Sequence, residues 1–158
     1  MGNKKRDNNQ RRAPVKSEFD HKVIDVRRVT RVVAGGRRFS FSVAVVIGDR
    51  KGRVGVGIGK AGDTALAIDK AMNAAKKNMI KLPASKTNSI AHEVEAKFNA
   101  SRLYIKPAPG RGLVAGSSVR VVLNLAGITD VNAKLFSRSK NKLNNARAAI
   151  LALKKLEA

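Results

Sequence analysis

The stretch that decides the fold of this chain is residues 39–60, which read FSFSVAVVIGDRKGRVGVGIGK. Residues 39–47 and 53–58 are rich in Val, Ile and Phe, and a glycine-bounded segment separates them, so the pattern predicts two antiparallel strands. In the second strand Gly55, Gly57 and Gly59 alternate with Val54, Val56 and Ile58. One face of that strand therefore packs with side chains, while the other is bare and open to the approach of a bulky group.

The flanking residues extend these two strands into a small α+β unit. Residues 23–33 predict another strand, which turns through Gly35 and Gly36 into the next. Residues 62–81 change to a helical period that Asp63 or Thr64 can cap, and Leu82-Pro83 ends it. We therefore expect a three-stranded antiparallel sheet with one helix across it, at residues 18–82. The predicted apolar stripe of the helix is Ala65, Ile68, Met72, Ala75 and Met79.

A second α+β unit is predicted at residues 88–158. Residues 89–98, 102–106 and 128–137 have the composition of strands, a loop follows the second of them at 107–112, and residues 141–156 form a helix. The segment 116–126 is ambiguous. Val119, Val121, Leu123 and Leu125 alternate as in a strand, whereas Val119, Val122, Leu123 and Ala126 fit a short helix. Periodicity alone favours the strand.

Residues 1–17 combine Lys, Arg, Asn and Gln with hardly an apolar side chain. Such a segment cannot offset the entropy of ordering itself, so we expect a disordered basic tail. A tail of this kind either follows RNA or merely keeps the chain soluble. Its clustered Lys and Arg residues favour RNA.

The charge of the chain points to a polyanion as its partner. There are 33 Lys and Arg residues against 11 Asp and Glu, a formal net charge of +22. Cations in this excess repel one another, and a phosphate backbone relieves the repulsion by exchanging its counterions for them. A membrane is disfavoured because the chain has no Trp and the Gly2 start has Arg6 where a myristoylation pattern needs Ser or Thr. With no cysteine, no secretory signal and no long apolar run, we expect a cytoplasmic protein.

No motif in the chain predicts catalysis, a cofactor or a metal site. The glycines before Lys60 do not form a phosphate-binding loop, because Val54 replaces the first glycine and Ala61 the magnesium-binding hydroxyl. The dinucleotide fingerprint also fails, because the third glycine comes one residue early. His21 and His92 lack metal-ligand spacing, and Glu93 and Glu95 lack an acid–base partner. We therefore expect no enzyme.

Basic residues accompany the first strands and their turns. Arg37 and Arg38 precede Phe39 and Phe41, a sequence similar to the base-stacking strand of RNA-recognition motifs, but that strand follows a helix and this one does not. We expect both Phe side chains to enter the core. Arginine forks suit phosphate oxygens and a glycine turn lets backbones approach, so the pattern favours structured RNA read by shape. The candidate RNA-binding residues are Arg27, Arg28, Arg31, Gly35, Gly36, Arg37, Arg38, Arg50, Lys51, Arg53 and Lys60.

Several motifs resemble those of the bacterial-type small-subunit ribosomal protein five family. They are GRRFSF at 36–41, VVIGD at 45–49, GRVGVGIGK at 52–60, AKKNMI at 75–80, KPA at 106–108, GLVAG at 112–116, Arg120, and AGITDV at 126–131. The resemblance covers residues 19–155. It implies an N-terminal domain similar to a double-stranded-RNA-binding fold and a C-terminal β-β-α-β-α domain with a left-handed βαβ crossover. It also implies a helix at 116–126, against the periodicity.

The same resemblance implies a role in the small ribosomal subunit. Members of the family bind its ribosomal RNA and small-subunit proteins four and eight, near the mRNA entry channel and the decoding region. They contribute to assembly, to head–body positioning and to translational accuracy. Residues 30–38, with Thr30, Ala34, Gly35 and Gly36, resemble a loop near the spectinomycin site, and Gly112 and Arg120 resemble the surface facing protein four. The segment 109–112 is one residue shorter than is common, with Arg111 where Thr is usual.

Overall fold

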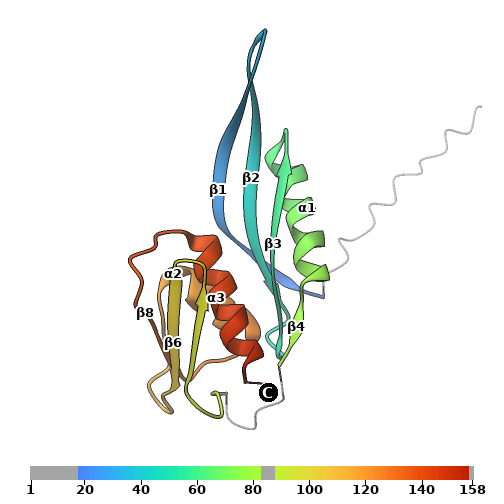
Figure 1. Cartoon of the computed structure of the whole chain (residues 1–158). Helices are drawn as coiled ribbons and strands as arrows, with labels where there is room; N and C mark the ends of the chain where they lie inside the picture. Colours follow the sequence, from blue (N-terminus) through green and yellow to red (C-terminus); the bar gives the residue numbers. More distant parts are fainter. Residues whose placement is uncertain (1–17, 83–87, 157–158) are drawn as a thin grey trace, which may run out of the picture.

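A computed structural model describes residues 18–82 and 88–156 of the chain, which form two sheets and the helices between and beside them (Figure 1). The first sheet and its helix comprise β1 (Asp20–Val33), β2 (Gly36–Gly48), β3 (Arg53–Ala61), α1 (Thr64–Lys77) and β4 (Ile80–Lys81). The second part comprises β5 (Val94–Phe98), β6 (Ser101–Pro107), β7 (Leu113–Val114), α2 (Ser117–Ala126), β8 (Val131–Leu135) and α3 (Lys142–Lys154). The predicted α+β class is confirmed. The predicted tail at 1–17 lies outside the described residues.

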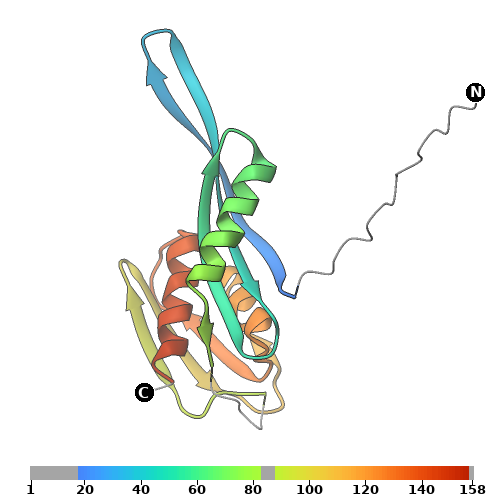
Figure 2. The same cartoon turned by 90° about the vertical axis from the view of Figure 1, so that its right-hand side faces the viewer.

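The first sheet has the strand order β1-β2-β3-β4, and all its neighbouring strands are antiparallel. The predicted meander of three strands is present, with β4 added at the edge of β3. Strands β1 and β2 are longer than predicted and extend past the end of β3 as a two-stranded hairpin (Figures 1 and 2). A register shift between Val23 and Asp25 interrupts the pairing with β2 near the start of β1.

Helix α1 packs on the glycine face of β3, so the bulky group that approaches this face belongs to the chain itself. A Cβ built on Gly57 would lie 2.2 Å from the carbonyl oxygen of Ala71, and Gly55 and Gly59 are equally tight against the helix. The fully buried residues on the helix are Ala67, Ala71 and Ala75. The predicted stripe was wrong in part. Helix α1 approaches β3 so closely that alanines, and not the longer side chains of the stripe, make the contact.

The longer side chains of the predicted stripe flank this contact. Ile68, Met72 and Met79 pack at its margins, and Ala65 is exposed. Asp63 is the N-cap of the helix and accepts a hydrogen bond from the Thr64 N–H (2.7 Å).

The second sheet has the order β5-β6-β8-β7, with β7 parallel to β8 and the other pairs antiparallel. The segment between β7 and β8 is the helix α2, so the periodicity that favoured a strand was misleading. Alternation failed there because α2 is buried on several sides, including Val119, Val122 and Leu125. Gly127 in the left-handed region (φ 85°) ends the helix. The predicted strands at 89–98 and 128–137 are shorter, at 94–98 and 131–135.

One core joins the two halves of the chain. Val46, Val54 and Val56 on the second face of the first sheet belong to the same buried cluster as the inner residues of α2, α3 and the second sheet. Strands β2 and β3 are therefore covered on both faces where they leave the hairpin, which explains the unbroken apolar run from Val43 to Ile47. None of the helices among the described residues has the length and hydropathy that a membrane span requires.

The turn between β2 and β3 is attached to the end of α2. The N–H of Arg50 donates to the carbonyl of Leu125 (3.0 Å), and the N–H of Gly52 donates to the carbonyl of Ala126 (3.1 Å). A Cβ at Gly48 would lie 2.2 Å from the carbonyl oxygen of Leu125. Backbone contact across this junction therefore sets the orientation of the first sheet relative to the second.

We predict that Gly57→Ala lowers the free energy of unfolding by about 2–3 kcal/mol, because the methyl group collides with helix backbone that cannot move alone. Gly62→Ala is the matched control, since nothing lies within 4 Å of a Cβ there. Urea unfolding followed by circular dichroism measures both. Equal midpoints for the two variants would show that α1 is not held this close to β3.

Candidate nucleic-acid interface

The outer half of the β1–β2 hairpin carries most of the predicted RNA-binding residues. Its tip is a two-residue turn at Ala34 and Gly35, with Val33 paired to Gly36. Gly36 has a φ of +123°, a conformation that would be strained for a residue with a side chain. A Cβ at Gly35 or Gly36 would meet nothing within 4 Å. The segment 30–38, expected as a loop, is therefore two strand ends and a tight turn. The glycines serve the turn and leave its backbone open to a partner.

One face of the hairpin holds cations in cross-strand rows. Arg31 lies opposite Arg38 in the register, and Arg27, Ser42 and Lys60 follow one another across three strands. These four cationic side chains are exposed. Like charges placed directly opposite on a sheet repel each other, so this face favours a bound anion.

The other face of the hairpin combines cations with exposed apolar groups. The guanidinium carbon of Arg28 lies 4.6 Å above the centre of the Phe39 ring. Phe39 is 48% exposed and Val32 is 77% exposed. The prediction that Phe39 enters the core was wrong, because neither of the two core clusters formed by residues 18–82 and 88–156 reaches the hairpin at this height. Phe41, one step lower on the same face, packs against the α1 cluster as predicted.

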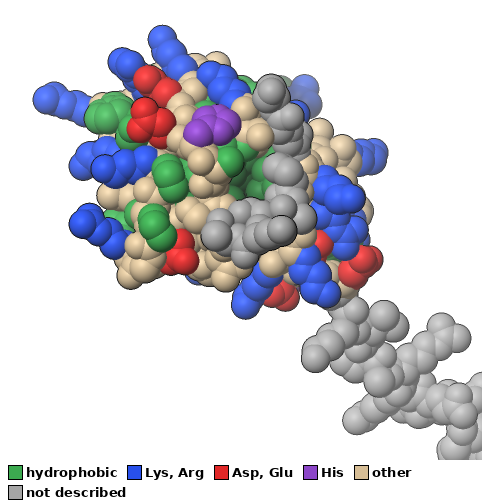
Figure 3. All heavy atoms as spheres, turned by 90° about the horizontal axis from the view of Figure 1, so that it is seen from below, with side chains coloured by type: hydrophobic (Ala, Val, Ile, Leu, Met, Phe, Trp, Pro, Cys, Tyr) green, Lys and Arg blue, Asp and Glu red, His purple; other side chains and the backbone are tan. Residues whose placement is uncertain are grey.

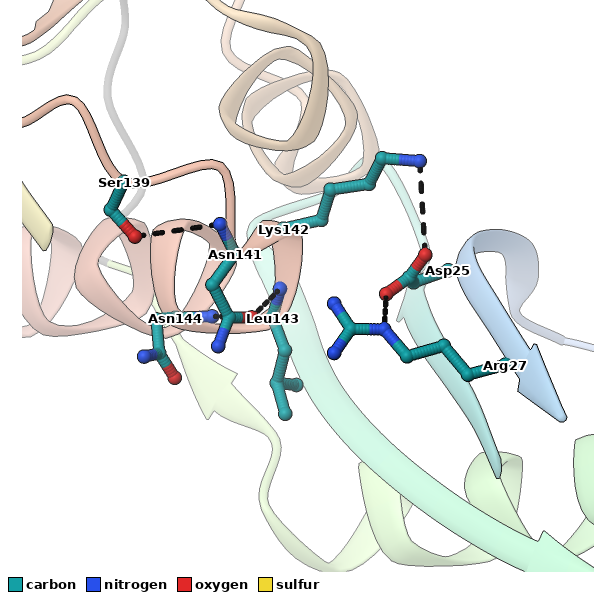
Figure 4. A network of polar contacts seen from close by, with 7 residues as sticks. All are labelled: Asp25, Arg27, Ser139, Asn141, Lys142, Leu143 and Asn144. Atoms are coloured by element: carbon teal, nitrogen blue, oxygen red, sulfur yellow. Dashed lines mark hydrogen bonds and ion pairs between the residues drawn. The ribbon is translucent and has the colours of Figure 1, made fainter. Parts of the chain in front are cut away.

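Asp25 ties the base of the hairpin to the second half of the chain (Figure 4). Its carboxylate accepts from Arg27 Nε at 2.6 Å and lies 3.8 Å from Lys142 Nζ at the start of α3. Asn141 caps that helix, accepting from the N–H groups of Leu143 and Asn144. Arg27 is thus partly neutralised. Sequence analysis missed this contact because Asp25 and Lys142 are far apart in the chain.

The remaining predicted cations, Arg50, Lys51 and Arg53, lie at the opposite end of the first sheet, in or next to the β2–β3 turn. Arg50 is in the left-handed region (φ 57°) and pairs with Asp20 (3.1 Å). Arg53 contacts Glu18 (3.0 Å) and Asp49 (2.6 Å). The eleven predicted positions therefore form two separate groups.

Asp49 organises this turn. Its side chain is 6% exposed and accepts from the N–H groups of Lys51 and Arg53 as well as from the Arg53 guanidinium. Burial raises the pKa of the Asp49 carboxyl, but the hydrogen bonds from Arg53 and the backbone outweigh it, so the pKa is lower than usual. The same carboxylate raises the pKa of Arg53. Both groups are committed to holding the turn.

The two residues expected at a protein interface flank the β7–α2 connection. Gly112 directly precedes β7 with a φ of +69°, a conformation that favours glycine. Arg120 is in the first turn of α2 and lines a groove of about 800 Å³. The groove lies between the first residues of β1, the Arg50 turn and α2, with Asp20 and Lys142 on its walls.

The remaining polar residues singled out in the sequence have surface positions. His21 lines the same groove, and His92 is exposed before β5. The Tyr104 hydroxyl donates to Glu93, and Glu95 pairs with Arg102, which lowers the pKa of Glu95. Within residues 18–82 and 88–156, no three His, Cys, Asp or Glu side chains are grouped as metal ligands. Seen from the end opposite the hairpin tip, Lys and Arg side chains line the rim of the molecule (Figure 3).

Family comparisons match both halves of the chain. The N-terminal domain model of ribosomal protein S5 matches residues 19–83, and its C-terminal domain model matches residues 96–158. Small ribosomal subunit protein uS5 of Gloeobacter violaceus is 48% identical over 92% of this chain and 65% of its own length. The protein of the same name from Thermosynechococcus vestitus is 45% identical over 97% of this chain and 87% of its own length. Small ribosomal subunit protein uS5c of Emiliania huxleyi is 46% identical over 88% of this chain and 87% of its own length.

The chain spans 65% of the length of the Gloeobacter violaceus protein, 64% of uS5 of Mycoplasmopsis agalactiae and 57% of uS5 of Mycoplasma mobile, so these relatives carry segments outside the match. The match to the Thermosynechococcus vestitus protein covers most of both chains. Both domain models match in the order of the two sheets. The chain therefore belongs to the ribosomal protein S5 family, uS5.

Proposed function

We propose that this chain is a structural component of the small ribosomal subunit that binds its ribosomal RNA and makes or breaks no bond. The observation that carries the proposal is the cationic hairpin, which extends past its own core in a chain whose relatives are named small ribosomal subunit protein. An exposed hairpin of arginines with an open glycine tip fits between phosphate backbones. The net charge of +22 fits the same partner.

Within this proposal the hairpin residues supply the main phosphate contacts. Arg31, Arg37 and Arg38 are exposed and form no ion pair among the described residues, so their guanidinium groups meet a phosphate without first losing a partner. The guanidinium of Arg28 lies over the Phe39 ring, and because Arg28 is exposed it remains accessible to a phosphate. Arg27, Gly35, Gly36 and Lys60 complete this contact surface.

The second group of cations makes a weaker contribution. Arg50 and Arg53 are already paired with carboxylates, so a phosphate must compete with Asp20, Asp49 and Glu18 for them. Lys51 is exposed and forms no ion pair in the described part of the chain. We place Lys51 as the phosphate contact of this turn, with the two arginines beside it.

The family resemblance supports a more detailed placement. The hairpin tip, with Thr30, Ala34, Gly35 and Gly36, reaches the head–body junction near the spectinomycin site. The surface around Gly112 and Arg120 faces small-subunit protein four, and the chain also contacts protein eight and lies near mRNA at its entry channel. In this placement the chain is bound to ribosomes in the cytoplasm and contributes to assembly and accuracy. The groove beside Arg120 provides a recess for a partner side chain.

The same resemblance supports a finer description of the fold. The first sheet with α1 forms a domain at 18–82 similar to a double-stranded-RNA-binding fold, and the domain at 88–158 carries β7, α2 and β8 as a left-handed crossover. The parallel pairing of β7 with β8 through a helix is consistent with such a crossover unit. The shared core makes the two domains a single rigid support for the hairpin.

Sedimentation of a cell lysate through a sucrose gradient tests the proposed function. We expect the chain to migrate with small subunits and with whole ribosomes at moderate salt. A free-standing RNA-binding regulator, the rival function that the charge also allows, would stay near the top of the gradient. That outcome would exclude a ribosomal role.

Reversing the charge of Arg37 and Arg38 tests the hairpin. The variant Arg37→Glu/Arg38→Glu should bind small-subunit ribosomal RNA more weakly, and the slope of log affinity against log salt should fall by roughly two units, one for each lost phosphate contact. Filter binding over a salt series measures this slope. Lys76→Glu/Lys77→Glu in α1 is the control, since it changes the net charge equally. Equal slopes for the two variants would leave the hairpin no special role.

Replacing Arg120 tests the accuracy proposal. We expect Arg120→Leu to raise misreading of near-cognate codons in a translation reporter, because it alters the proposed surface facing protein four. Growth should be retained, because the side chain is exposed and its loss does not disturb the core. Arg138→Leu, an exposed arginine of the second half outside the groove, serves as the control. Unchanged misreading with Arg120→Leu would remove the proposed interface.

A further inference from the structure

The second sheet has an open face that the proposed function does not use. Residues on one face, including Ala96, Leu103, Ile105 and Ala133, are buried under α2 and α3. Residues on the other face of the same strands point away from the helices and remain exposed or half-buried. This face belongs to the outermost layer of the molecule, on the far side of the helices from the first sheet (Figure 1).

Two aromatic rings lie together on this open face. Tyr104 is on β6, and Phe136 directly follows β8, with its N–H donating to the carbonyl of Arg102 (3.0 Å). Their ring centres are 6.1 Å apart and the rings are tilted by 49°. Strands β6 and β8 are the two central strands of the sheet, and Phe136 is 61% exposed. An exposed aromatic ring in this position leaves its flat face available for stacking.

Cations surround the two rings. Lys97, Arg102, Lys106 and Lys134 all lie on the open face, on β5, β6 and β8. The carboxylates on this face are already engaged, since Glu95 pairs with Arg102 and Glu93 accepts from the Tyr104 hydroxyl. Within the described part of the chain the three lysines form no ion pair. The face is therefore net positive and has cations free for phosphates.

We propose that the open face of the second sheet binds a short segment of single-stranded RNA. One base stacks on Phe136 with Tyr104 beside it, and the lysines hold the phosphates on either side. The arrangement resembles one common platform for single-strand recognition, a four-stranded sheet on which aromatic rings stack bases: Tyr104 lies on β6 and Phe136 directly follows β8. An acidic protein segment is the other anion that lysines attract, but the pair of rings with an exposed face favours bases. This site is separate from the hairpin, which meets folded RNA.

The absence of Trp from the chain allows a direct test. In the full-length variant Phe136→Trp the new indole is the only tryptophan and keeps the aromatic surface. Adding an oligouridylate of about eight nucleotides, a length within the usual range for a sheet platform, should quench its fluorescence at moderate salt. Leu66→Trp, at an exposed position on α1 (57%), is the matched reporter and should show no such quenching.

Affinity measurements on the same oligonucleotide complete the test. Phe136→Ala should weaken binding about tenfold, whereas Phe136→Trp should restore it, because stacking depends on the ring. Thermal unfolding should be unchanged, since the side chain is mostly exposed. Quenching that is absent, or equal at positions 136 and 66, would overturn the proposal, as would Phe136→Ala binding like the original chain. Quenching by purified small-subunit proteins and not by the oligouridylate would assign the face to a protein.

These outcomes are distinct from those for the proposed function. A failure at Phe136 leaves sedimentation with the small subunit and the salt dependence of Arg37→Glu/Arg38→Glu unaffected. Conversely, if the hairpin variant abolished oligouridylate binding and Phe136→Ala did not, the single-strand site would belong to the hairpin and the proposal would be rejected.

Discussion

Helix α1 lies backbone against backbone on β3, because Gly55, Gly57 and Gly59 place no side chain between them. This close contact makes β2 and β3 a wall that is covered on one face by α1 and on the other by α2 and the shared core. With both faces buried, the two strands cannot bend independently of either half of the chain. The outer part of the β1–β2 hairpin, which extends beyond this wall, is therefore held in a fixed direction.

The outer part of this hairpin is strongly cationic. The outer hairpin has little core of its own, and its register places Arg31 opposite Arg38. In water this arrangement is unfavourable, because like charges face each other across the strands. The shared core and the Asp25 contacts with Arg27 and Lys142 support the base of the hairpin against that repulsion. Binding to a phosphate backbone relieves this repulsion and so favours the complex. The packing of the wall is in this way linked to the proposed role in RNA binding.

The elements that the sequence predicted well are those set by local chemistry. The β2–β3 turn follows from its bounding glycines, and α1 follows from its period and from Asp63 as its cap. The α2 segment needed the family resemblance, because a short helix buried on several sides has no polar face to reveal its period. Strand β4 has only two residues and leaves no pattern.

The candidate site was predicted in composition more than in arrangement. Arg50 and Arg53 were grouped with the hairpin cations, yet the antiparallel register puts them at the other end of the sheet. Phe39 was predicted to be a core residue because it shares a strand face with Phe41. The sequence pattern does not show that the packed part of the sheet ends between these two residues. The pairing of Tyr104 with Phe136 depends on β6 meeting β8, a contact between distant segments that local patterns do not contain.

Directed hydroxyl-radical probing from the hairpin tip tests the central claim most directly, and the chain has no native cysteine to interfere. Iron–EDTA would be tethered to Ala34→Cys, with Asn73→Cys in α1 as a second position, in reconstituted small subunits. The structure predicts strong cleavage of ribosomal RNA at a few defined nucleotides from the tip, different from those reached from α1. Cleavage from the tip no stronger than from unattached reagent would show that the hairpin does not enter RNA and would contradict the account.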